Sequence, residues 1–356
     1  MSANEQNRHQ EQIGPSAVPA DAPRRKVTRV DVARRAGVSE ATVSYVLSKK
    51  RHVSAKLTER VNQAVRELDY IPDMIASSMV VKKSRTIGIL TEDIANPLYI
   101  TVFKGIQRAA DRRGYFVNIC NGTGNSGHIM KDFIRRKMDG VFIVMVTDTI
   151  NSYLKRLCDR GISVVYNMVP GLCDDRICGI DLDMKDGMRQ ILTYLAGLGH
   201  KKIVYLSAFD RAYVQDERLQ GFWEAAGELG LDEAWVDEGK PPYPSTVESG
   251  AAQTEALLKR GRPFTAMVCT NDLMAYGAMQ TLRKRGLRVP EDISVVGIDN
   301  IFYSPLTTPP LTTLDHGGEG YGERLFEILY ENMTSGAVRR EYYPTRLIIR
   351  ESCAKI

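Results

Sequence analysis

Polar side chains stand at the ends of several short apolar runs in this 356-residue chain. Asp93, Ser207, Asn271 and Asp299 each follow such a run, and Arg218 lies in the first turn of a predicted helix. Carboxylates, amides and hydroxyls with one guanidinium suit the hydroxyl groups of a sugar, a nucleoside or a similar polyol better than they suit catalysis. The alternative is that each residue caps a helix or holds a turn, which applies most to Asn271.

A second candidate contact surface lies just after Ser39. If this stretch is helical, Val43 and Leu47 are buried on one side. The opposite side then presents short and polar groups to a partner: Glu40, Ala41, Ser44 and Tyr45. A helix with a buried back and such a face is a candidate recognition helix.

Three short helices are predicted to position that face. Thr28 can cap a first helix that runs to about Ala36, Gly37 ends it, Ser39 can cap the second, and Ser54 the third. Two short helices joined by a tight glycine turn make a helix-turn-helix, whose second helix can enter the major groove of DNA. A generic three-helix protein-interaction module is the alternative.

The distribution of charge favours a nucleic-acid partner. Residues 24–85 hold 15 lysines and arginines against 6 acidic residues, whereas the segments on either side are slightly acidic. Cationic side chains that neutralise phosphates release condensed counterions, so a local basic excess is typical of nucleic-acid binding. From charge alone, a solvated basic surface is the alternative.

From Arg85 onward, short β-branched runs alternate with amphipathic stretches, which is typical of parallel βαβ units. Seven strands are predicted on this basis: 86–90, 116–120, 140–146, 162–166, 202–207, 266–269 and 293–297. The rhythm implies two similar lobes, each with a doubly wound sheet. Ligands bind beyond the carboxyl ends of such strands, so the polar residues there are expected to face one cleft.

A short segment joins the two regions. Residues 73–79 follow Pro72 and could form a two-turn helix. Isolated helices of that length are marginal in water, so it would need a partner to form. A plain linker is the alternative.

With these motifs the chain resembles the lactose-repressor (LacI/GalR) family of transcription regulators. The resemblance is nearly gapless over residues 27–72 and continues through ILTEDIANPLY, LGHKKIVYLS, RLQGF, TNDLMAYGAM and VPEDISVVGIDN. It implies an all-α helix-turn-helix head followed by an α/β, two-lobed domain like that of periplasmic binding proteins, with two doubly wound parallel sheets.

The resemblance implies a role for the head. Glu40 and Ala41 match the positions that set base specificity, whereas Tyr45 departs from the arginine that many members carry. In the family, residues 73–79 form a hinge helix that orders on DNA, and Met79 stands where a leucine wedges into the minor groove. The expected DNA contacts are Thr28, Arg29, Ser39, Glu40, Ala41, Thr42, Ser44, Tyr45, His52 and Met79.

The resemblance also implies effector contacts. Arg218, Asn271, Asp299 and Asp186 match effector-contacting positions, and Tyr99 lies near the pocket wall. Ser245 falls where relatives often stack an aromatic ring on the ligand, and Tyr243 could replace it. The expected effector site is Asp93, Tyr99, Asp186, Ser207, Arg218, Tyr243, Asn271 and Asp299.

Several other signals exclude classes of protein. No apolar run approaches the roughly 20 residues that span a bilayer, and the first 23 residues lack the features of a signal peptide. The six cysteines and five histidines lack metal-ligand spacing, so neither a metal nor a cofactor is expected. Residues 122–127 match the G-x-G-x-x-G pattern of dinucleotide-binding sites. They follow the second predicted strand and not the first, however, and the acidic residue that such a site requires downstream is missing, so nucleotide binding is not expected there.

The sequence therefore predicts a cytoplasmic regulator, not an enzyme. A homodimer, expected to be a repressor, would bind a pseudo-palindromic operator, because paired half-sites multiply the affinity of one small head. A sugar or related polyol would control it. The rivals are a stand-alone solute-binding receptor, which lacks a basic head, and a carbohydrate-active enzyme on the same fold.

The expected parts are a disordered extension (1–26), a helix-turn-helix domain (27–71), a hinge helix and linker (72–84), and an effector-binding and dimerisation domain (85–356).

Overall fold

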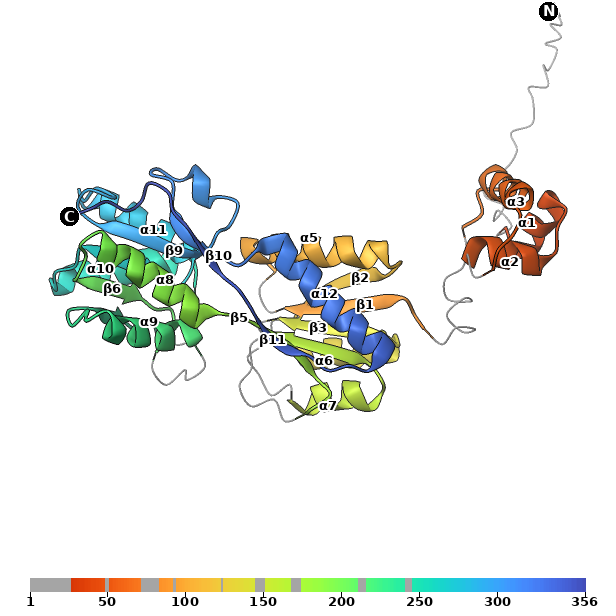
Figure 1. Ribbon diagram of the computed structural model, residues 1–356, viewed down its shortest axis with the longest axis horizontal. Helices are drawn as coiled ribbons and strands as arrows, with labels where there is room; N and C mark the ends of the chain where they lie inside the picture. The colour runs from red at the N-terminus through yellow and green to blue at the C-terminus, as the bar shows by residue number, and fades with distance from the viewer. Residues whose placement is uncertain are drawn as a thin grey trace, which may run out of the picture. The chain divides into compact units, whose positions relative to one another are not determined.

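A computed structural model describes residues 27–48, 51–71, 83–91, 94–122, 124–144, 151–167, 174–210, 216–240 and 245–356. The chain divides into two compact units, Met1–Ser77 and Ser78–Ile356. Figure 1 shows the helices and strands of each unit, most of them labelled.

The first unit contains a three-helix head: α1 (Arg29–Ala36), α2 (Glu40–Ser48) and α3 (Ala55–Glu67). Thr28 and Asp31 form a capping box at the start of α1, and Gly37 ends that helix with a φ of 62°. Val32, Val43 and Val61 are fully buried between the helices. The predicted helix-turn-helix is confirmed, although the Ser54 side chain makes no capping hydrogen bond.

The second unit contains two lobes, each built on a six-stranded sheet. Lobe 1 has the strand order β11-β5-β4-β3-β1-β2, and its strand pairs are parallel. Its elements are β1 (Thr86–Thr91), α5 (Pro97–Arg112), β2 (Phe116–Asn121), α6 (Ser126–Arg135), β3 (Gly140–Val144), α7 (Asn151–Asp159), β4 (Ser163–Asn167), β5 (Cys178–Leu182), α12 (Gly318–Ser335) and β11 (Arg340–Tyr343).

Lobe 2 has the strand order β12-β10-β9-β8-β6-β7. Its elements are α8 (Met184–Gly197), β6 (Ile203–Leu206), α9 (Glu217–Glu228), β7 (Trp235–Asp237), α10 (Val247–Arg260), β8 (Ala266–Cys269), α11 (Asp272–Lys284), β9 (Ser294–Asp299), the short 3-10 helix η1 (Ser304–Leu306), β10 (Thr312–Asp315) and β12 (Arg346–Ile348).

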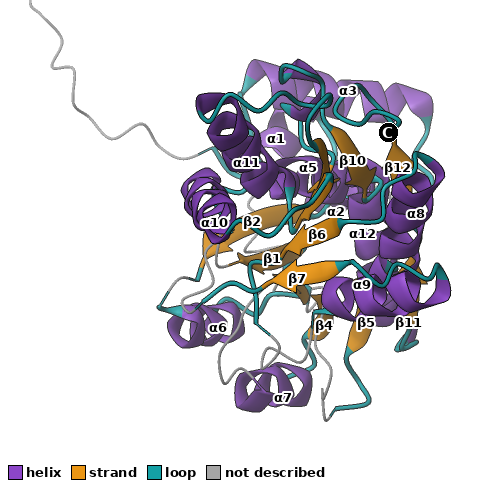
Figure 2. Ribbon diagram, turned by 90° about the vertical axis from the view of Figure 1, so that its left-hand side faces the viewer, coloured by secondary structure: helices purple, strands orange, loops and turns teal. Residues whose placement is uncertain are grey.

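Helices cover both faces of each sheet, so the central strands are buried on both sides. In lobe 1, Ile87 and Ile89 of β1 pack with α5 and α12, whereas Leu90 packs with α6 and α7. In lobe 2, Tyr205 of β6 faces α8 and α9, and Leu206 faces α10 and α11. Figure 2 shows these two helix pairs of lobe 2 on opposite sides of the strands.

The chain passes between the lobes three times, from β5 to α8, from β10 to α12 and from β11 to β12. The late elements α12 and β11 therefore belong to lobe 1, where α12 lies beside α5 (Figure 1). Because β10 runs toward lobe 1 and β12 returns from it, β10 and the edge strand β12 are antiparallel. This pair is the exception to the predicted parallel sheets.

Each of the seven predicted strands is present within two residues of its predicted bounds, with residues 145–146 outside the described chain. The fold class is confirmed. Five further strands, β5, β7, β10, β11 and β12, were not predicted.

Within the described ranges, no helix is both long and apolar enough to cross a membrane. The same residues contain no group of three or more His, Cys, Asp or Glu side chains that could hold a metal ion. The five described cysteines are free thiols, and burial raises the pKa of each.

Candidate functional site

The surface that is predicted to contact DNA is the start of α2. The Ser39 hydroxyl accepts a hydrogen bond from the Thr42 backbone N–H at 3.2 Å, which caps the helix. Val43 of this helix is buried in the head core. Glu40 and Ala41 are exposed.

The basic side chains of the head differ in their contacts. The guanidinium of Arg51 lies 5.0 Å from the centroid of the Tyr45 ring, which holds that ring by a cation–π contact. Arg34 and Arg35 pair with Asp31 and Glu67, respectively. Other cationic or titratable side chains near the surface are Arg29, which is partly buried, and His52, which is exposed.

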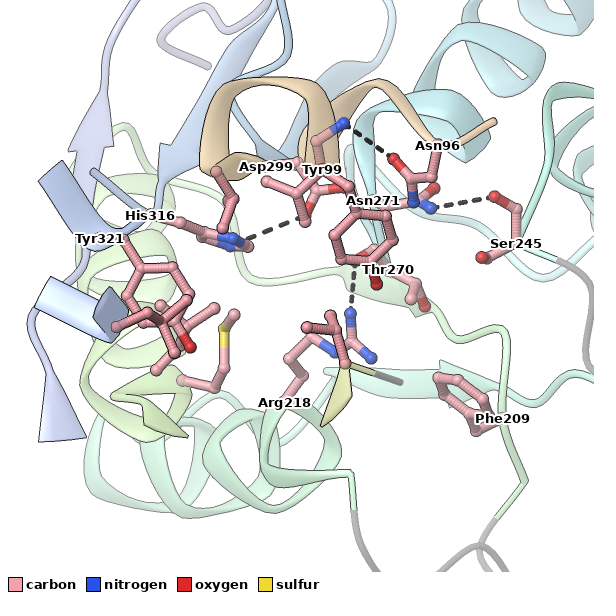
Figure 3. A pocket seen from close by; sticks show the side chains of 16 residues that line it. Asn96, Tyr99, Phe209, Arg218, Ser245, Thr270, Asn271, Asp299, His316 and Tyr321 are labelled. Atoms are coloured by element: carbon pink, nitrogen blue, oxygen red, sulfur yellow. Dashed lines mark hydrogen bonds and ion pairs between the residues drawn. The ribbon is translucent and has the colours of Figure 1, made fainter. Parts of the chain in front are cut away.

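A cavity of about 80 Å³ lies between lobes 1 and 2. Figure 3 shows its walls. Lobe 1 supplies mainly apolar side chains: Leu98, Tyr99, Val102, Val144, Leu182, Tyr321 and Leu325. Lobe 2 supplies most of the polar groups: Arg218, Ser245, Thr270, Asn271 and Asp299. The ligand that this cavity favours therefore has an apolar side and a polar edge.

Four expected effector contacts come together here: Tyr99, Arg218, Asn271 and Asp299. Ser207 does not line the cavity, because its buried hydroxyl bonds both the carbonyl and the N–H of Phe209. Asp186 does not line it either, since its carboxylate accepts from Arg189 and Gln190. Met79, Asp93 and Tyr243 lie outside the described residues, so their roles stay predictions.

Hydrogen bonds to Asp216 and Thr270 fix the Arg218 side chain in the cavity wall. Its Nε donates to Asp216 Oδ1 at 2.8 Å, and Nη1 donates to the Thr270 carbonyl at 3.2 Å. Asp216 also caps α9, and its side chain is 1% exposed. The positive charge of Arg218 is therefore already compensated within the protein.

The turn between β8 and α11 supplies two more polar groups. Asn271 Oδ1 caps α11 by accepting from Met274 N–H at 2.9 Å, while Nδ2 donates to the Ser245 carbonyl at 2.9 Å. Thr270 Oγ1 accepts from the Ala208 N–H at 2.7 Å and donates to the Leu206 carbonyl at 3.1 Å. Asn271 thus caps a helix and lines the cavity at once.

Asp299 and His316 form a buried polar corner of the cavity. Asp299, at the end of β9, has a φ of 120°, in a region that residues other than glycine rarely adopt. Burial, then the charge of Asp272, raises the pKa of Asp299 well above its usual range. Burial, then Arg218, lowers the pKa of His316 to about 3, so its ring is neutral near pH 7. The 3.7 Å contact between His316 Nε2 and Asp299 Oδ1 is therefore not an ion pair.

Asp272 lies behind this corner and does not line the cavity. Its carboxylate accepts hydrogen bonds from the Ile301 N–H and from the hydroxyls of Ser304 and Thr313. Burial nevertheless raises its pKa to about 6. The carboxylate thus ties the turn after β9 and strand β10 to the first turn of α11.

We expect Asp272 to make the stability of the second unit fall as pH rises. A carboxyl whose pKa is higher in the folded state binds its proton more tightly there, so its stabilising contribution is full below pH 3.8 and is lost as pH rises through about 6. Between roughly pH 4 and 7, the free energy of unfolding of the wild type should fall by about 2 kcal/mol relative to that of Asp272→Asn. Urea unfolding across this range measures the difference, and parallel pH profiles would contradict the assignment.

Several lining residues were not predicted. Thr270 and Phe209 lie within two residues of the predicted Asn271 and Ser207, and Asn96 lies three residues before Tyr99. The fold brings their side chains to the cavity, which neighbouring positions in the sequence do not show. His316 directly follows β10, whose sequence TTLD is not an apolar run, and precedes two glycines. It therefore lacked the strand-end signal that marked Asp299, because no apolar run precedes it.

Comparisons with known proteins cover nearly the whole chain. The family described as "Bacterial regulatory proteins, lacI family" matches residues 28–73, and "Periplasmic binding protein-like domain" matches residues 192–353. The HTH-type transcriptional repressor PurR of Vibrio vulnificus (strain CMCP6) is 35% identical over 336 residues, which cover 92% of this chain and 98% of that protein. PurR of Vibrio cholerae serotype O1 (strain M66-2) is 37% identical over 314 residues, covering 85% and 90%.

Solved structures of transcription regulators are also similar to this chain. The Lac repressor dimer bound to operator and the anti-inducer ONPF has a TM-score of 0.77 and 29% sequence identity, covering 93% of this chain and all of that chain. The transcriptional regulator CelR in complex with cellobiose has a TM-score of 0.68 and 27% identity, covering 92% of this chain and 99% of that one.

Proposed function

Because the chain belongs to the lacI family of bacterial regulatory proteins, we propose that it is a DNA-binding repressor of transcription, not an enzyme, and that a small molecule controls its affinity for an operator. The observation that carries the proposal is the head: α2 turns Val43 inward and Glu40 and Ala41 outward, within a segment rich in lysine and arginine. A stand-alone solute receptor would not need such a head.

The roles in the head follow from chemistry and position. Glu40, Ala41, Ser44 and Tyr45 would meet base edges in the major groove. The other DNA contacts would be Thr28, Arg29, Ser39, Thr42 and His52, with Met79 as the wedge in the minor groove. The protein would act in the cytoplasm as a homodimer, each head binding one half-site of a pseudo-palindromic operator.

A random-oligonucleotide selection at low salt tests this function. We expect the full-length protein to enrich duplexes with two related half-sites. Because phosphate contacts release counterions, affinity for the selected duplex should fall by about a thousandfold or more between roughly 50 and 200 mM salt. Failure to enrich any duplex would contradict the proposal.

For the effector, we propose a sugar or related polyol. Carboxyl, amide and guanidinium groups converge on the cavity from Asp299, Asn271 and Arg218, and such groups bind hydroxyls. The effector would change the angle between the lobes and hence the spacing of the two hinges, coupling the sites by about 1 to 3 kcal/mol.

A purine is the second candidate. The name of the PurR relatives points to purines, and the apolar side chains of lobe 1 suit a flat ring. Thermal-shift screening of sugars, sugar phosphates, nucleosides and purine bases separates the candidates. A true effector at about 100 times its dissociation constant should stabilise the protein by about 2.7 kcal/mol.

A further inference from the structure

His316 lies on the crossover that carries the chain from β10 of lobe 2 to α12 of lobe 1. The next residues, Gly317 and Gly318, have φ values of 76° and 43°, which turn the backbone directly after the histidine. The side chain is 2% exposed and lines the cavity (Figure 3). A single imidazole therefore faces the cavity from a joint between the lobes.

The ring of His316 makes no hydrogen bond to the described residues through either nitrogen. Asp299 Oδ1 is 3.7 Å from Nε2, which is longer than a hydrogen bond. His200 is equally buried, yet its Nδ1 lies 2.9 Å from Thr265 Oγ1 and its Nε2 lies 3.0 Å from Ser294 Oγ. Buried polar groups are normally bonded. His200 thus has the partners of a structural histidine, and His316 does not.

The charges around the ring restrict what can bind there. Besides His316, whose ring is neutral near pH 7, the described lining residues with an acidic or basic side chain are Arg218 and Asp299. Arg218 is compensated by Asp216, and Asp299 adds a further carboxyl, with Asp272 behind it. An anionic ligand would therefore meet a carboxyl that no free cation among the described lining residues offsets. A neutral imidazole offers one donor and one acceptor.

We propose that His316 determines effector specificity: beside Asp299, its ring hydrogen-bonds an uncharged effector that carries a donor and an acceptor on neighbouring atoms. Vicinal hydroxyls of a sugar and the polar edge of a nucleoside base both have this chemistry. The assignment rests on the proposed function, since it concerns the same cavity. It also places the effector in contact with a crossover, so the ligand bonds a segment shared by the two lobes.

Calorimetric titration of the full-length protein tests this. The probes are D-glucose, D-ribose and adenosine, each beside its phosphorylated counterpart: glucose 6-phosphate, ribose 5-phosphate and AMP. We expect an uncharged probe to bind at least about tenfold more tightly than its phosphate. His316→Leu should weaken that binding by about tenfold or more, and His316→Gln, which keeps a donor and an acceptor, by much less.

Melting temperature without ligand separates recognition from folding. His316→Leu should melt no lower than the wild type, because it removes polar atoms that have no hydrogen-bond partner among the described residues. His200→Leu, the matched control, should melt lower, because it leaves Thr265 and Ser294 without their bonds.

Three results would overturn the role of His316: preferential binding of the phosphates, unchanged affinity in His316→Leu, or no binding of the uncharged probes at millimolar concentration. None of these depends on DNA. If the wild type selects an operator while His316→Leu binds the probes normally, the specificity role alone fails. If no duplex is selected, the repressor function fails instead.

Discussion

Arg218→Met is expected to lower the free energy of unfolding of the second unit by about 3 to 5 kcal/mol. The substitution removes the cation from a buried pair and leaves the carboxylate of Asp216, 1% exposed, without its charge partner. The cost of that uncompensated charge exceeds the net contribution of the intact pair. Urea unfolding followed by a probe of the second unit measures the loss.

A double substitution provides the control for Arg218. Asp216→Asn keeps the capping oxygen at the start of α9 while removing the charge. The Asp216→Asn/Arg218→Met protein should therefore recover most of the stability that Arg218→Met loses. Simple addition of the two single effects would show that the residues are not coupled. In both proteins we expect the response to an effector to be lost, because Arg218 lines the cavity.

Gly322→Ala is expected to destabilise lobe 1 by about 3 kcal/mol. The helices α5 and α12 pack so closely that a Cβ on Gly322 would lie 2.1 Å from the Val102 carbonyl oxygen. A backbone atom cannot rotate away, so the helices must separate. Gly105 on α5 meets the Glu319 carbonyl in the same way, at 2.0 Å. Chemical denaturation of the full-length protein gives the measurement.

Gly227→Ala is the matched control for Gly322. Gly227 lies in α9, is exposed, and would place its Cβ with no atom within 4 Å. Alanine should therefore stabilise the helix by about 0.5 kcal/mol, through backbone entropy alone. Equal effects at both positions would contradict the close approach of α5 and α12.

Much of the fold was predictable because it depends on contacts close in sequence. The three head helices are set by Thr28, Gly37 and apolar spacing, all of which act within a few residues. Six of the seven predicted strands are short apolar runs that are buried on both faces of a sheet, whereas β2 is an exposed edge strand. The unpredicted β7, β11 and β12 are short edge strands, for which this signal is weak.

The polar groups of the candidate site were predictable in part. Arg218, Asn271 and Asp299 stand at ends of elements, and parallel strands bring their carboxyl ends to one edge. The side chains of Ser207 and Asp186 instead bond residues only a few positions away. A sequence pattern cannot tell a strand-end group that faces a cavity from one that closes its own turn, since both use the same residue types.

The sequence by itself determined a basic three-helix head and two sheets with polar strand ends, because caps, charge and periodicity are local. Only the tertiary structure decided that the chain crosses three times between the lobes and returns α12 to lobe 1. The same arrangement decided that Arg218 is neutralised by Asp216 and that His316 faces the cavity without a hydrogen-bond partner in the described part of the chain. These properties depend on burial and on distances between residues far apart in the chain, and local interactions do not specify them.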